Sequence, residues 1–219
     1  NLFVASSKTE NDTTDKYIQF LGLCSHEYFH TWNVKRIKPA AFLPYDLATE
    51  NYTTLLWVFE GWTSYYDDLF LVRHGLISAE QYLKLLGKTL TRVRKGSGLH
   101  KQSLAESSYT TWTKFYRQDE NAPNAIISYY AKGSLAALGL DLRIRLATNG
   151  VTSLDDVMKE LWNRFGAKGI GVRFQQLGVA TAGHRESYEG RREASARGAG
   201  CGTDQNGPQI PWDRRLSGH

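Results

Sequence analysis

The residues best suited to chemistry form one short sequence, His26-Glu27-Tyr28-Phe29-His30, which has the pattern H-E-x-x-H. Two histidines four positions apart on a helix lie on one face, so both imidazoles can reach the same metal ion. Glu27 lies one position further round the helix, where its carboxylate can contact a water on that metal without being a ligand. Zinc suits two imidazoles and a carboxylate with a fourth position left open. The pattern therefore predicts a hydrolytic zinc site, with His26 and His30 as ligands and Glu27 as general base.

A zinc site of this kind needs a third protein ligand, and two downstream carboxylates are candidates. A third histidine six residues after His30 would mark the metzincin class, but Arg36 occupies that position. Glu50 falls at a spacing that some thermolysin-like enzymes use, whereas Glu60 stands in the middle of an apolar, aromatic segment. An unpaired carboxylate in such a segment would be costly to bury. We therefore favour Glu60 as the third ligand and keep Glu50 as the alternative.

The sequence around these residues predicts helices that would position them. In a helix over residues 16–31, apolar side chains would lie on nearly every face, which indicates a buried helix. Apolar periodicity and terminal residues predict further helices over residues 54–73, 78–94, 126–148 and 154–165. Ser78 and Gln81 match a capping box at the start of the third of these helices. Ser153 and Asp156 match another at the start of the fifth, and no convincing strand is predicted in the first 165 residues.

Composition and charge exclude several classes of protein. The chain has 219 residues, of which 41% are hydrophobic, and no apolar run approaches the roughly 18–20 residues that span a bilayer. Cys24 and Cys201 are too few for a disulfide framework, and Cys24 is expected to be a buried thiol that points away from the metal. The net charge of +5 is scattered rather than gathered in one patch, which argues against nucleic-acid binding. No signal peptide opens the chain at Asn1, which favours a cytoplasmic location.

The character of the sequence changes near Gly166. Residues 166–219 hold 11 of the 20 glycines but only three aromatic residues, and the apolar periodicity stops there. Such a segment has little to bury, so residues 167–219 are predicted to be a divergent, disordered Gly/Arg-rich tail. Residues 1–166 are expected to form the catalytic unit, and the start without an initiator methionine suggests a fragment of a longer protein.

Four segments of the chain resemble the glycyl aminopeptidase family, over about residues 17–166. They are CSHEYFHTWNVKRIKP (24–39), WVFEGWTSY (57–65), KFYRQDENAP (114–123) and ISYYAKG (127–133). The second also looks like the W-x-x-E-G-x-x-x-Y element of gluzincin aminopeptidases, whose Glu is the third zinc ligand. The resemblance implies His26, His30 and Glu60 as zinc ligands and Glu27 as the catalytic base.

Tyr130-Ala131-Lys132-Gly133 matches the Y-x-K-G element of related aminopeptidases, in which the Tyr hydroxyl stabilises the tetrahedral intermediate. A phenol aimed at a developing oxyanion acts only where charge appears during the reaction. The resemblance therefore implies a catalytic role for Tyr130, and Tyr129 is the alternative.

The resemblance also implies a fold and an activity. The fold would be mainly α: the helical part of a thermolysin-like (gluzincin) zinc peptidase domain, truncated on its N-terminal side and often associated with a PDZ domain. The activity would be Zn²⁺-dependent release of small N-terminal residues, such as Gly or Ala, from peptides. Two alternatives remain open: an endopeptidase of the same fold, and a catalytically inactive domain that binds zinc or a protein partner.

Overall fold

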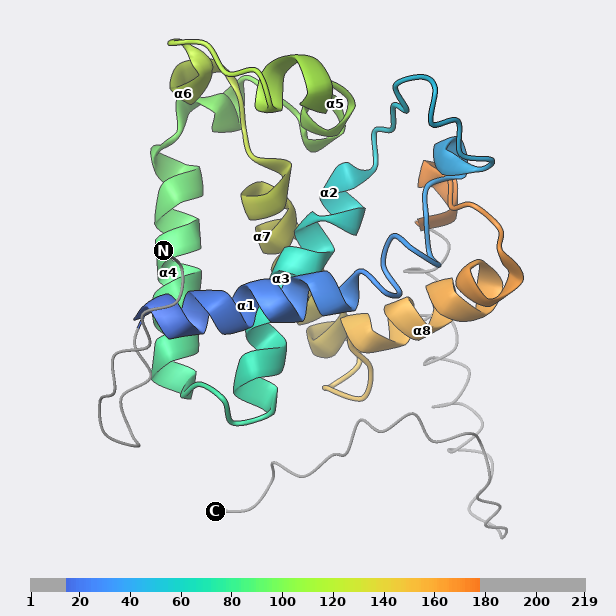
Figure 1. The fold of residues 1–219 in the computed structure, drawn as a ribbon. Helices are drawn as coiled ribbons and strands as arrows, with labels where there is room; N and C mark the ends of the chain where they lie inside the picture. Colours follow the sequence, from blue (N-terminus) through green and yellow to red (C-terminus); the bar gives the residue numbers. More distant parts are fainter. Residues whose placement is uncertain (1–14, 178–219) are drawn as a thin grey trace, which may run out of the picture.

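The structure is a computed structural model that describes residues 15–177. Within these residues the fold is mainly helical, as predicted, and the extended pairings are two isolated bridges, Asn33 with Ile37 and Pro39 with Val172. The α-helices are α1 (Asp15–Phe29), α2 (Leu56–Phe59), α3 (Gly61–Arg73), α4 (Ala79–Lys95), α5 (Leu104–Tyr109), α6 (Ala122–Ala125), α7 (Tyr129–Ala147) and α8 (Leu154–Arg164) (Figure 1). The predicted capping boxes at Ser78 and Ser153 are both present and begin α4 and α8.

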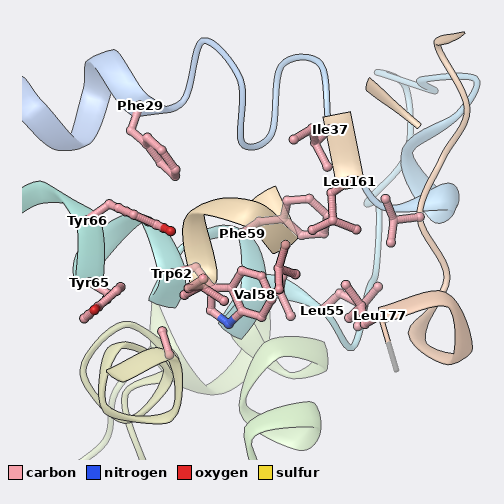
Figure 2. Packing of buried hydrophobic residues seen from close by; sticks show 14 of the residues in the cluster. Phe29, Ile37, Leu55, Val58, Phe59, Trp62, Tyr65, Tyr66, Leu161 and Leu177 are labelled. Carbon is pink, nitrogen blue, oxygen red and sulfur yellow. The ribbon is translucent and has the colours of Figure 1, made fainter. Parts of the chain in front are cut away.

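Helix α3 is the centre of the fold and contacts α1, α2, α4 and α7. Figure 1 shows α1 lying across α3. Helix α4 lies near the N-terminal end of α1, and α8 lies towards its C-terminal end. The main core gathers on α2 and α3, where Val58, Phe59 and Trp62 are almost completely buried (Figure 2). Phe29, the last residue of α1, stacks on Tyr66 of α3 with ring centroids 4.9 Å apart. This packing holds the end of α1 against the middle of α3.

Two glycines bring the start of α7 close to the junction of α2 and α3. A Cβ atom on Gly61 would lie 2.6 Å from the Cα atom of Gly133, and one on Gly133 would lie 2.7 Å from the backbone oxygen of Trp57. Real Cβ atoms do not approach so closely, so neither position has room for a side chain. The close approach places Tyr130, in the first turn of α7, near Glu60.

The predicted helix over residues 54–73 is two helices, which meet at Glu60. The apolar pattern runs unbroken through this segment, so periodicity alone could not reveal the interruption. A hydrogen bond from the Asn33 side chain to the Phe59 carbonyl lies at this junction. Glu60 keeps a helical backbone at this junction: its N–H donates to the Leu56 carbonyl at 2.7 Å, and its carbonyl accepts from Ser64 at 2.8 Å.

The prediction that the first helix is buried is wrong for much of its surface. Leu23 and Tyr28 are 56% and 67% exposed, and the buried residues of α1 are Ile18, Gly22 and Phe29. Cys24 is exposed as well, so the prediction of a buried thiol is also wrong. Apolar composition indicated that α1 has an apolar surface, but it could not indicate which part of that surface other elements cover.

The described chain continues past Gly166, where the catalytic unit is predicted to end. Val172 bridges to Pro39 and is 1% exposed, and Leu177 joins the main core. The rest of the predicted tail lies outside the described residues. Among residues 15–177, no helix has both the length and the apolar character needed to cross a membrane.

Candidate metal centre

His26, His30 and Glu60 come together although they belong to separate parts of the fold. The Oε2 atom of Glu60 lies 3.3 Å from Nε2 of His26 and 3.2 Å from Nε2 of His30. One ligand atom from each residue lies within 4.8 Å of the others, a spacing that could hold a metal ion. All three side chains are half-buried. The convergence predicted for the two imidazoles and Glu60 is therefore present.

The other ring nitrogen of each histidine has its own acceptor. His26 Nδ1 lies 3.1 Å from Oδ2 of Asp67, and His30 Nδ1 lies 2.8 Å from the backbone oxygen of Asn33. Both partners accept, so each ring donates its Nδ1 proton to them and turns Nε2 towards Glu60. Each Nε2 atom shares a proton with the Glu60 carboxylate when no metal is bound, and a cation could take the place of those protons. This donor set fits Zn²⁺, which binds histidine nitrogens whose second nitrogen is held in this way.

The pKa values of these groups reflect their mutual contacts. Burial opposes the charge on His26, but hydrogen bonds to Asp67 and Glu60 outweigh it and raise its pKa to about 9. Burial favours a neutral carboxyl on Glu60, yet the hydrogen bonds from His26 and His30 lower its pKa to about 2. The centre thus keeps Glu60 ionised and ready to bind a cation. A metal ion would displace the Nε2 protons and leave those on Nδ1, because only the coordinating nitrogen must be deprotonated.

Glu27 and Tyr130 line the same open cavity as the three candidate ligands. Its volume is about 710 Å³, and its wall also includes Asp67 and Asp68. The carboxylate of Glu27 is exposed to this cavity, as a group that exchanges protons with water must be. The rings of His26 and Tyr130 have centroids 6.2 Å apart, which places Tyr130 beside the candidate metal position.

The structure distinguishes the predicted residues from their alternatives. Tyr129 is 1% exposed, and its hydroxyl accepts a hydrogen bond from Thr111 at 2.9 Å, so it belongs to the core. Glu50 is exposed, accepts a hydrogen bond from Tyr52, and is not part of the group around His26. The geometry therefore favours Tyr130 and Glu60.

The sequence analysis did not assign a role at this site to three residues that lie there. Asp67 in α3 follows Glu60 by seven positions, or two helical turns, so the spacing could have placed both side chains on one side of this segment. Asn33 and Tyr116 gave no such signal. Tyr116 comes from a separate segment, and its hydroxyl lies 3.3 Å from that of Tyr130. Burial, with a hydrogen bond to Tyr116, raises the pKa of Tyr130 and keeps its phenol protonated.

Comparisons with known proteins show which family the chain belongs to. Residues 19–136 match the family model described as M61 glycyl aminopeptidase. The chain is also similar to a crystal structure of an aminopeptidase N family protein from Idiomarina loihiensis, with 55% sequence identity and a TM-score of 0.73. The similarity covers 78% of this chain but 28% of that one, so the chain spans less than a third of that protein. No curated protein matches the chain. The family model covers more than half of the sequence, and the chain therefore belongs to the M61 glycyl aminopeptidase family.

Proposed function

We propose that this chain carries the zinc centre and the proton-transfer groups of an aminopeptidase that releases small N-terminal residues from peptides. The observation that carries the proposal is the convergence of His26, His30 and Glu60 beside the carboxylate of Glu27. Membership of a peptidase family supports hydrolysis of peptide bonds. The preference for small residues such as Gly or Ala rests on the resemblance to glycyl aminopeptidases.

Five residues on the cavity wall have tasks in this proposal. Zinc, when bound by His26, His30 and Glu60, supplies a Lewis acid that acidifies water and polarises the substrate carbonyl. Glu27 accepts the proton of the attacking water and passes it to the leaving amine, a contribution typically worth about 10²–10⁴-fold in rate. The Tyr130 hydroxyl donates a hydrogen bond to the oxyanion that develops on the carbonyl oxygen.

Substitution of Glu27 tests the proposed base. The Glu27→Gln variant keeps the size of the side chain but cannot accept a proton, so we expect it to bind zinc as the wild type does and to lose at least about 10²-fold in kcat. The matched control is Glu80→Gln, which changes an exposed carboxylate in the first turn of α4. Zinc content is measured by plasma mass spectrometry and turnover with glycyl and alanyl anilides. Wild-type turnover in Glu27→Gln would remove Glu27 from its assigned role.

The same assay separates the alternatives. An aminopeptidase cleaves substrates with a free α-amine and leaves N-acetylated peptides intact, whereas an endopeptidase of the same fold cleaves both. One equivalent of bound zinc without turnover on either substrate would favour a catalytically inactive zinc-binding domain. The 219-residue chain is the protein to test, because it contains every residue named here.

A further inference from the structure

We propose that Asn33 is a positioning residue that joins the two halves of the metal centre. One half is the end of α1 with His30, and the other is the junction of α2 and α3 with Glu60. Asn33 lies between them and is completely buried, with 0% of its surface exposed. The inference rests on the proposed function, since it concerns the geometry of the same zinc site.

The backbone of Asn33 fixes the orientation of His30. Nδ1 of His30 donates to the backbone oxygen of Asn33 at 2.8 Å, and this contact decides how the ring presents Nε2 to Glu60. The next residue, Val34, has a φ of 148°, a conformation that a β-branched residue rarely adopts. Such a conformation persists only where the surroundings impose it. The direction of the Asn33 carbonyl is therefore set by the packing of this turn.

The side chain of Asn33 provides that packing at the other half of the centre. Its Nδ2 atom donates towards the backbone oxygens of Val58 and Phe59, at 3.3 and 3.2 Å, and lies 3.2 Å from Oγ1 of Thr63. Helix α2 ends at Phe59 and α3 begins at Gly61, so the two carbonyls directly precede Glu60. The same amide group thus holds the backbone directly before Glu60, the third candidate ligand.

The contacts require a donor at this position. Two of the three partners are carbonyl oxygens, which only accept, and the Thr63 hydroxyl already donates to Phe59 at 2.5 Å. The amide oxygen of Asn33 is buried without a hydrogen-bond partner among the described residues. The position therefore uses the NH₂ group of the side chain. An aspartate of the same size would place a carboxylate oxygen against these acceptors and push the two halves apart.

Metal binding is the quantity that this role controls. The wild type, Asn33→Asp and a control are compared for Zn²⁺ affinity by competition with a chromophoric chelator, and for the visible absorption spectrum of bound Co²⁺. The control is Thr148→Val, which removes a buried hydrogen-bonding hydroxyl at the opposite end of α7 from Tyr130. The thermal unfolding of the metal-free proteins is measured in parallel. We expect Asn33→Asp to bind Zn²⁺ about 10–100-fold more weakly, with an altered Co²⁺ spectrum. Thr148→Val should lose stability and keep both metal properties.

The outcomes separate this inference from the function on which it rests. Wild-type affinity and an unchanged Co²⁺ spectrum in Asn33→Asp would overturn the role of Asn33 and leave the zinc site standing. A wild type that binds neither metal would overturn the zinc site and this inference with it. If Asn33→Asp does not fold, the Thr63→Val variant tests the inference instead. This substitution removes one hydrogen-bond partner of the Asn33 amide and keeps the shape of the side chain at position 63. Weaker Zn²⁺ binding by Thr63→Val supports the inference, and unchanged binding contradicts it.

Discussion

The Oε2 atom of Glu60 lies 3.3 Å from Nε2 of His26, although 34 positions separate the two residues in the chain. His30 approaches the same oxygen at 3.2 Å, so one carboxylate faces two imidazoles. The contact depends on the packing of α1 across α3. A fold that brings these three groups together and holds both Nδ1 atoms is preorganised for a metal ion.

Asp67 should matter for metal binding although it is not a candidate ligand. Its carboxylate accepts from Nδ1 of His26, which fixes the ring and raises the pKa of His26. We expect Asp67→Asn to weaken Zn²⁺ binding by about 10–100-fold and to lower the His26 pKa. Chelator competition measures the affinity, and NMR titration of the metal-free protein measures the pKa. Asp119→Asn, which changes an exposed carboxylate, is the control. Equal affinity in the two variants would remove Asp67 from the site.

The two adjacent tyrosines should respond differently to loss of the hydroxyl. Tyr130→Phe removes the proposed donor to the oxyanion, so kcat should fall by about 10²–10³-fold with zinc affinity unchanged. Tyr129→Phe removes a buried hydrogen bond with Thr111, so it should cost about 1 kcal/mol of stability and little activity. Steady-state kinetics and thermal unfolding of both variants make the comparison. A larger loss of kcat in Tyr129→Phe would reverse the assignment.

Asp68 should make the stability of the fold depend on pH. Burial, together with the nearby charge of Asp67, raises its pKa from 3.8 to about 7. A raised carboxyl pKa means that the native state holds the proton more tightly, so stability falls as the pH rises from about 4 to 7. Asp68→Asn cannot ionise. It should therefore be more stable than the wild type at pH 8. The expected gain is about 1–3 kcal/mol, less than the full pKa shift would give, because solvent screens part of the effect.

The advantage of Asp68→Asn should disappear below about pH 4, where the wild-type carboxyl is protonated in both states. Urea unfolding at a series of pH values provides the measurement. A difference between the two proteins that does not change with pH would show that the charge of Asp68 is not responsible.

The sequence predicted the local features of this protein better than its tertiary arrangement. The capping residues Ser78 and Ser153 identified two helix starts, because a cap depends on residues only three positions apart. The pattern around His26 identified a candidate metal site for the same reason. The gap between α2 and α3 at Glu60 was missed, because the apolar pattern runs unbroken through it. The exposure of Leu23 was missed because periodicity shows that a helix has an apolar surface, but not whether other elements pack against it.

Glu60 and Glu50 allow the central claim to be tested with matched variants. Both are glutamates that were candidates for the third ligand, and only Glu60 lies beside the two imidazoles. Isothermal titration of Zn²⁺ into the wild type, Glu60→Gln and Glu50→Gln is the most direct measurement. One equivalent should bind to the wild type and to Glu50→Gln with equal affinity, and Glu60→Gln should bind more than about 100-fold more weakly, a larger loss than that of an outer contact. Undiminished binding by Glu60→Gln, or no binding by the wild type, would contradict the account.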